Sequence, residues 1–184
     1  MTKHIVRYVL AAAALLAGAA APAHAQQGFA LKGHYLFNES KVKGADSIPA
    51  ADGFSVGAEY VLPLNVGIGV SGYTTGHITE ANRRSTEYGF LAEANYFFKL
   101  PIIPVAPYAG VNAGLGHYTV NELSGAEAKI QDTRTQLGFQ VGARLQLTHM
   151  LGVDAQYRRV SQSAADSQSS RLERNQVLVG VTLF

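Results

Sequence analysis

The chain has 184 residues, of which 47% are hydrophobic and only 15% are charged. It contains no cysteine, which excludes disulfides and thiolate metal sites. A formal net charge of +2 gives no reason to expect nucleic acid as a partner.

The first 25 residues have the layout of a secretory signal peptide. Lys3 and Arg7 lie at the start of an apolar run that extends to Ala20, and Ala23-His24-Ala25 offers small residues for cleavage. A membrane-spanning helix needs roughly 20 apolar residues, more than this run supplies. We therefore predict export, cleavage after Ala25 and a single mature domain over residues 26–184. Loss of Lys3 and Arg7 leaves 13 of the 15 basic residues against 13 acidic ones.

The mature sequence alternates between apolar and polar residues in eight segments. From Thr135 to Leu147 the odd positions after Thr135 are all apolar, and the even positions are Gln, Gly or Arg. Successive side chains of a strand point to opposite faces, so this pattern predicts strands with one apolar and one polar face. Tilted membrane strands need roughly 9–11 residues. The predicted strands are 28–38, 53–62, 66–75, 86–98, 105–118, 134–147, 151–160 and 175–184.

The connections between these segments alternate in length. Segments 63–65, 99–104 and 148–150 are short, whereas 39–52, 76–85, 119–133 and 161–174 are longer and polar. Outer-membrane barrels have short periplasmic turns and long extracellular loops. The sequence thus predicts an all-β fold, an eight-stranded antiparallel up-and-down transmembrane β-barrel with both ends in the periplasm.

Aromatic residues support a membrane location. Tyr and Phe form girdles at both rims of the apolar band in such barrels. The alternative is a soluble β-protein with these aromatics in its core. That alternative has to explain why charged residues lie at mid-strand on the face opposite the aromatics. We assign Phe29, Tyr60, Tyr96 and Phe98 to the periplasmic girdle and Tyr35, Phe37, Phe54, Tyr88 and Tyr157 to the outer one.

The alternating strands, the segment Pro107–Gly114 and the ending Val179–Phe184 resemble the OmpA-like and OmpX-like family of outer-membrane barrels, often described as porin-family domains. The resemblance covers the mature chain and does not extend to the periplasmic peptidoglycan-binding domain of full-length OmpA. It implies that Phe184 serves as an assembly signal. Members of this family carry an outward-facing aromatic residue at the last position. In this chain the alternation points Leu183 outward, which puts Phe184 out of phase with the outward face. Either the strand bulges near its end, or Phe184 is recognised outside the sheet.

The polar faces carry four basic and four acidic residues. The interior of an eight-stranded barrel is only wide enough for side chains, so ion pairs between them are expected. This network is either a selectivity site in a channel or a structural plug, and we expect the plug. Its members are Lys32, Glu59, Glu87, Glu93, Arg134, Arg144, Asp154 and Arg158.

Two other functional classes compete with a structural or surface-interaction barrel: a lipid A-modifying enzyme and a small passive channel. An acyl-transfer or deacylase site needs a Ser or Asp beside a His. His34, His77, His117 and His149 show no such arrangement, and no metal or cofactor motif is present, so we predict that the chain is not an enzyme. We expect a monomer whose partners are outer-membrane lipid, lipopolysaccharide and the barrel assembly machinery. Arg83-Arg84 and the polar segment 161–170 lie in predicted external loops.

Overall fold

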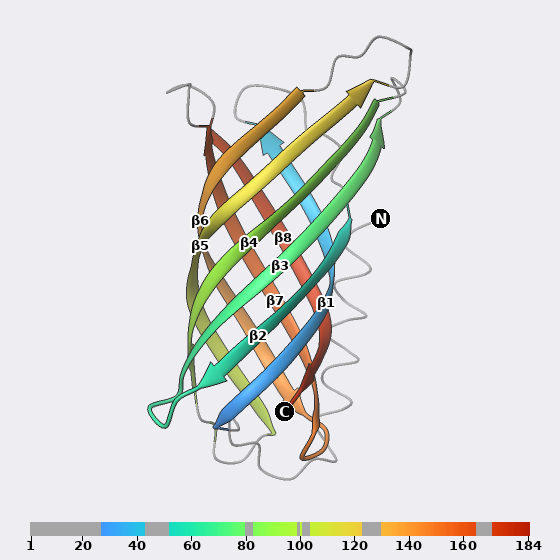
Figure 1. Cartoon of the computed structure of the whole chain (residues 1–184). Helices are drawn as coiled ribbons and strands as arrows, with labels where there is room; N and C mark the ends of the chain where they lie inside the picture. The colour runs from blue at the N-terminus through green and yellow to red at the C-terminus, as the bar shows by residue number, and fades with distance from the viewer. Residues whose placement is uncertain are drawn as a thin grey trace.

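The computed structural model describes residues 27–42, 52–79, 83–98, 100, 104–122, 130–164 and 171–184. Eight antiparallel strands form a closed barrel in which each strand pairs with the next and β8 pairs with β1 (Figure 1). The strands are β1 (Gly28–Val42), β2 (Gly53–Val61), β3 (Val66–Thr79), β4 (Arg83–Phe97), β5 (Val105–Glu122), β6 (Ile130–Gln146), β7 (Leu151–Ala164) and β8 (Arg171–Leu183). The predicted eight-stranded up-and-down barrel is confirmed. The predicted signal peptide lies outside the described residues.

Each strand alternates between the barrel interior and its outer surface. On β2, Phe54 and Val56 are 62% and 68% exposed, whereas Ser55 and Glu59 are 2% and 1% exposed. The outer surface is therefore mostly apolar and the interior mostly polar, the reverse of a soluble barrel. No described helix is long and apolar enough to cross a membrane.

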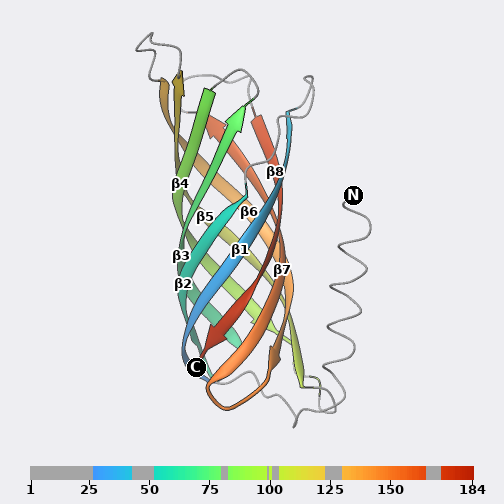
Figure 2. The ribbon, with the colours of Figure 1, turned by 90° about the vertical axis from the view of Figure 1, so that its right-hand side faces the viewer.

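The β2–β3, β4–β5 and β6–β7 connections lie at one end of the barrel, called the turn end here, and the C-terminus lies at the same end (Figure 2). In the β2–β3 turn, Asn65 adopts a φ of 63°, a left-handed conformation that Asn tolerates. In the β6–β7 turn, the Thr148 hydroxyl oxygen accepts hydrogen bonds from the backbone N–H groups of Met150 and Leu151, at 3.2 and 3.0 Å. Local turn chemistry thus sets the register of these hairpins.

The strands extend further at the opposite end, called the loop end, than the sequence predicts. The predicted loop 76–85 is largely a ladder in which Gly76 pairs with Thr86 and Thr79 with Arg83, leaving only residues 80–82 between β3 and β4. Strict alternation of connection length is therefore wrong at this hairpin. Beyond the membrane both faces of a strand meet water, so the polarity pattern disappears although backbone pairing continues.

Candidate functional site: the polar interior of the barrel

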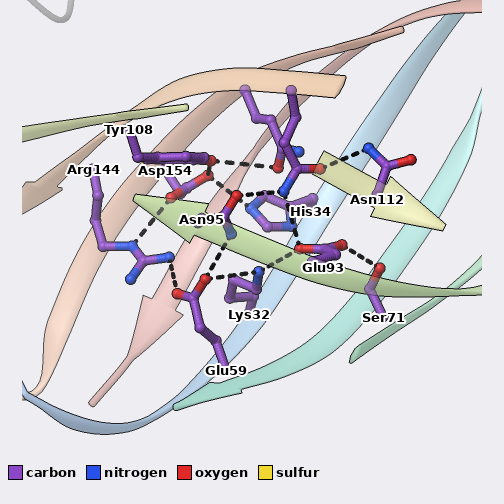
Figure 3. Close-up of polar contacts among 12 residues, drawn as sticks. Lys32, His34, Glu59, Ser71, Glu93, Asn95, Tyr108, Asn112, Arg144 and Asp154 are labelled. Carbon is purple, nitrogen blue, oxygen red and sulfur yellow. Dashed lines mark hydrogen bonds and ion pairs between the residues drawn. The ribbon is translucent and has the colours of Figure 1, made fainter. Parts of the chain in front are cut away.

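The middle of the turn-end half contains a chain of buried ion pairs, called the ionic chain here. Its acids alternate with its bases, so that Glu59 and Glu93 each contact two cationic groups. Glu93 accepts hydrogen bonds from Lys32 Nζ at 2.9 Å and from Arg158 Nη2 at 2.8 Å. Lys32 Nζ also lies 3.6 Å from Glu59 Oε1 (Figure 3). These four side chains are at most 6% exposed, and each comes from a different strand.

Arg144 extends the ionic chain to Asp154. Its Nη2 donates to Glu59 Oε2 at 2.7 Å and its Nε donates to Asp154 Oδ2 at 3.1 Å. The guanidinium carbon lies 4.9 Å from the centroid of the Phe97 ring and 5.9 Å from that of Tyr108. An arginine that is forked between two acids and packed on aromatic rings has little freedom to move, and this is the arrangement that makes a buried charge tolerable.

Neutral polar groups complete the contacts of the ionic chain. Asp154 accepts a hydrogen bond from the Tyr108 hydroxyl at 2.8 Å and contacts His34 Nε2 at 3.1 Å. Asn95 Nδ2 donates to Glu59 at 2.8 Å, and Gln140 Nε2 donates to Asn95 Oδ1 at 2.6 Å. The acids of the ionic chain are therefore both charge-paired and hydrogen-bonded, as buried carboxylates must be.

A second polar cluster lies nearer the loop end and is built around Glu87. This carboxylate accepts hydrogen bonds from Tyr73 at 2.7 Å, Gln162 at 2.9 Å and Gln136 at 3.2 Å. Its ion-pair partner is Arg174. Arg174 belongs to the segment 161–174, which the sequence predicts to be a loop. Continuation of the inward series of β8, through Gln176, Leu178 and Thr182, is the signal that identifies it as an interior residue.

Arg134 is one of the two predicted interior charges, with Glu87, that lie nearer the loop end than the ionic chain. It is half-buried in the loop-end part of β6, opposite Gly116 and Ala164. The other seven predicted charges divide between the two clusters, with Glu87 in the loop-end cluster and Lys32, Glu59, Glu93, Arg144, Asp154 and Arg158 in the ionic chain.

An apolar layer, formed by side chains of β1, β3, β4 and β8, lies between the two polar clusters. Leu36, Leu91 and Leu178 are at most 1% exposed and pack with Tyr73 in one hydrophobic cluster inside the barrel. Strand order places the layer: on β4, Leu91 lies between Glu87 and Glu93. This layer was not predicted, because each of its leucines is a single apolar residue in an otherwise polar face.

Inward glycines make room for the larger interior side chains. A Cβ on Gly142 would lie 2.5 Å from Cζ of Tyr108, whose hydroxyl donates to Asp154. We expect Gly142→Ala to lower the free energy of unfolding by about 1–3 kcal/mol through overpacking, measured by urea unfolding in lipid vesicles. Gly33→Ala is the matched control, since a Cβ there meets nothing within 4 Å. Equal unfolding midpoints for the two variants would contradict this role for Gly142.

The predicted girdle residues all lie on the outer surface, from 37% exposed for Tyr35 and Tyr157 to 62% for Phe54. Rings of Tyr35 and Phe54 are 5.2 Å apart near the loop end, and rings of Tyr96 and Phe98 are 5.2 Å apart near the turn end. Tyr157 departs from its assigned rim. It lies at the middle of β7, opposite Val141 and Val177, with its hydroxyl 2.9 Å from Asn175 Oδ1.

Phe184 is turned toward the interior at the turn end. The register of β8 with β1 and β7 runs without a break through Leu183, so no bulge restores the alternation. The Phe184 ring centroid lies 5.9 Å from the guanidinium carbon of Arg144, and its N–H donates to the Met150 carbonyl at 3.0 Å. Phe184 therefore covers the end of the ionic chain in the folded barrel.

The histidines whose side chains the structure describes are dispersed. His34 is inside the barrel, His149 is exposed in the β6–β7 turn, and His117 Nδ1 lies 3.0 Å from Thr133 Oγ1. The side chains of His77, Arg83 and Arg84 lie outside the described residues, as does segment 165–170.

Comparisons with known proteins agree with this architecture. No curated protein sequence is significantly similar to the chain. Neisserial surface protein A (NspA) shares 22% identity at a TM-score of 0.68, over 85% of this chain and 97% of its own. Ail, the attachment invasion locus protein of Yersinia pestis, shares 16% identity at a TM-score of 0.61, over 86% and 99%. Ail is also known in complex with the heparin analogue sucrose octasulfate, and that structure matches at a TM-score of 0.56 and 16% identity, over 85% and 99%.

These structural likenesses show a shared fold. The family model for the outer membrane protein beta-barrel domain matches residues 9–183, nearly the whole chain. The chain therefore belongs to this family and is an integral β-barrel protein of the outer membrane.

Proposed function

We propose that this protein is a monomeric barrel of structural and surface-interaction type whose lumen is closed by its own side chains. The observation that carries the proposal is the apolar layer of Leu36, Leu91 and Leu178 between two charged clusters. An eight-stranded barrel has an interior that side chains can fill, and open aqueous channels appear at about 16 strands. A hydrated ion would have to lose its water to pass the leucines and then displace paired charges.

A planar-bilayer recording tests the closed lumen. The wild-type monomer is expected to give no long-lived ohmic conductance. The double variant Leu91→Ser and Leu178→Ser, which makes the layer polar, is expected to give a measurable leak. Leu115→Ser is the matched control, because Leu115 is on the lipid-facing surface and 56% exposed. A steady nanosiemens-scale current from a verified wild-type monomer would overturn the plug and favour the channel.

The proposal includes export with cleavage after Ala25 and an orientation with the loop end outside the cell. The polar ends of the strands then extend beyond the membrane, and the loops between them are free to bind surface partners on a rigid support. The fold shared with Ail, whose name refers to attachment and invasion, supports an interaction role. Lipopolysaccharide and outer-membrane lipid surround the barrel, and the assembly machinery recognises its C-terminal strand with Phe184. Nucleic acid has no part in this function.

Epitope insertion tests the orientation. An epitope at Ser167, between β7 and β8, is expected to be labelled by antibody on intact cells. An epitope at Asn65, in the β2–β3 turn, is expected to be labelled only after the outer membrane is permeabilised. Labelling of intact cells at Asn65 but not at Ser167 would show the opposite orientation of the barrel. A lipid A mass profile that is unchanged by removal of the protein is expected from a non-enzyme, and a lost modification would favour the enzyme.

A further inference from the structure

The lipid-facing surface carries a groove centred on Gly72, called the Gly72 groove here. Gly72 points outward on β3, directly between Val56 on β2 and Phe90 on β4. The groove has a volume of about 280 Å³. Its lining includes Phe54, Val56, Gly72, Thr74, Tyr88 and Phe90.

The groove exists because one outward position lacks a side chain. Val56 and Phe90 stand on either side and are 68% and 72% exposed. The Phe90 ring comes within 3.5 Å of the place that a Gly72 Cβ would occupy, so this ring forms one wall. The backbone of β3 is the floor. Filling the groove therefore requires only one substitution, at Gly72.

The depth of the groove is set by strand register. On β3, Val66 pairs with Tyr96 of the turn-end girdle and Thr74 pairs with Tyr88 of the loop-end girdle. Gly72 lies six residues from Val66 and two from Thr74 along β3. At roughly 3.3 Å per residue, the groove thus lies in the loop-end half of the apolar band. This step rests on the proposed orientation, in which that half of the apolar band faces the outer leaflet.

The surface of the groove is almost entirely apolar. Its middle is formed by Val56, Gly72 and the Phe90 ring, and Thr74 and Tyr88 pair with each other at its loop-end edge. A molecule that fits is therefore an apolar chain. The groove is also continuous with the lipid-facing surface, so its occupant comes from the membrane.

We propose that the Gly72 groove is a binding site for one acyl chain of lipid A. Lipid A is the outer-leaflet lipid with several acyl chains, so in the proposed orientation its chains surround this half of the barrel. Ligand sites usually span roughly 300–1,000 Å³, so the groove holds a single chain segment and no head group. Preference for this site over the rest of the barrel comes from van der Waals fit, because bulk lipid is equally apolar.

Photolabelling of the full-length protein in nanodiscs tests the proposal independently of orientation in cells. The probe is lipid A with a diazirine on one acyl chain, and diazirine-phosphatidylethanolamine at equal mole fraction is the second arm. Lipid A is expected to label peptides from residues 66–97 roughly fivefold more than the opposite side of the barrel, a preference of about 1 kcal/mol. Phosphatidylethanolamine is expected to label the circumference evenly.

Groove-filling variants give the decisive comparison. Gly72→Leu is expected to abolish the excess labelling, and Gly72→Ala, whose Cβ meets Phe90 at ordinary contact distance, to reduce it. Gly33→Leu is the matched control: Gly33 also pairs with Val56, on the side away from the groove, so the added side chain lies on the lipid-facing surface outside the groove. Labelling that is even in the wild type, or equal for both lipids, or unchanged by Gly72→Leu, would overturn the proposal.

A second copy of the chain is the other possible occupant. Because the protein has no cysteine, Thr74→Cys introduces a single thiol at the edge of the groove. Oxidation in native outer membranes is expected to leave this variant monomeric. Efficient disulfide dimerisation would assign the groove to protein contacts and overturn the lipid site, while leaving the closed lumen and the topology unaffected.

Discussion

Arg144→Ala is expected to lower the free energy of unfolding by about 3–5 kcal/mol, because it leaves buried carboxylates without their partner. Arg144 bridges Glu59 and Asp154, which are 1% and 0% exposed. The substitution also removes the contact between the Arg144 guanidinium and the Phe97 ring. The effect is measured as a shift in the urea midpoint of the barrel in vesicles, followed by the gel mobility of unheated samples.

Arg159→Ala is the control for this prediction. Arg159 pairs with Glu173 at 2.5 Å on the outer surface of the barrel, where the two side chains are 47% and 44% exposed. Its removal leaves no charge buried in the lumen without a partner, so the midpoint is expected to stay much nearer that of the wild type than for Arg144→Ala. If Arg144→Ala were as mild as Arg159→Ala, the ionic chain would not be a stabilising element of the lumen.

Val141→Arg is expected to cost roughly 2–4 kcal/mol, because it places a charge on the lipid face near the bilayer midplane. Val141 is 46% exposed on the outer surface of β6, between Ala109 and Tyr157 of the neighbouring strands. The measurement is the same urea midpoint, together with the folded fraction recovered in outer membranes. Val141→Leu keeps the surface apolar and is expected to unfold like the wild type.

Thr135→Arg tests whether the cost of an arginine on the outer face of β6 depends on its depth in the membrane. Thr135 is exposed on the same face of β6, six residues nearer the loop end, where it pairs with Leu115 and Ser163. An arginine near the interface costs only about 0–1 kcal/mol. Equal losses at Thr135 and Val141 would show that the apolar band is not centred on Val141.

Strand number, face assignment and compartment followed from the sequence by itself. Each depends on local information: alternation with a period of two decides which face of a segment meets lipid, and a closed barrel is the only sheet that leaves no unpaired edge there. Thus Glu59, Arg144 and Asp154 were correctly expected to point inward before any strand was placed beside another.

The partners of those charges were decided only by the tertiary structure. Lys32 and Glu93 are 61 residues apart in sequence and meet across the barrel, and Glu87 pairs with Arg174, which was expected in a loop. Such contacts depend on the stagger between strands and on how far each ladder continues beyond the membrane. The inward turn of Phe184 and the groove at Gly72 have the same origin, because neighbouring strands shape both sites. A strand's own residues specify which way its side chains point, whereas closure and register determine what they meet.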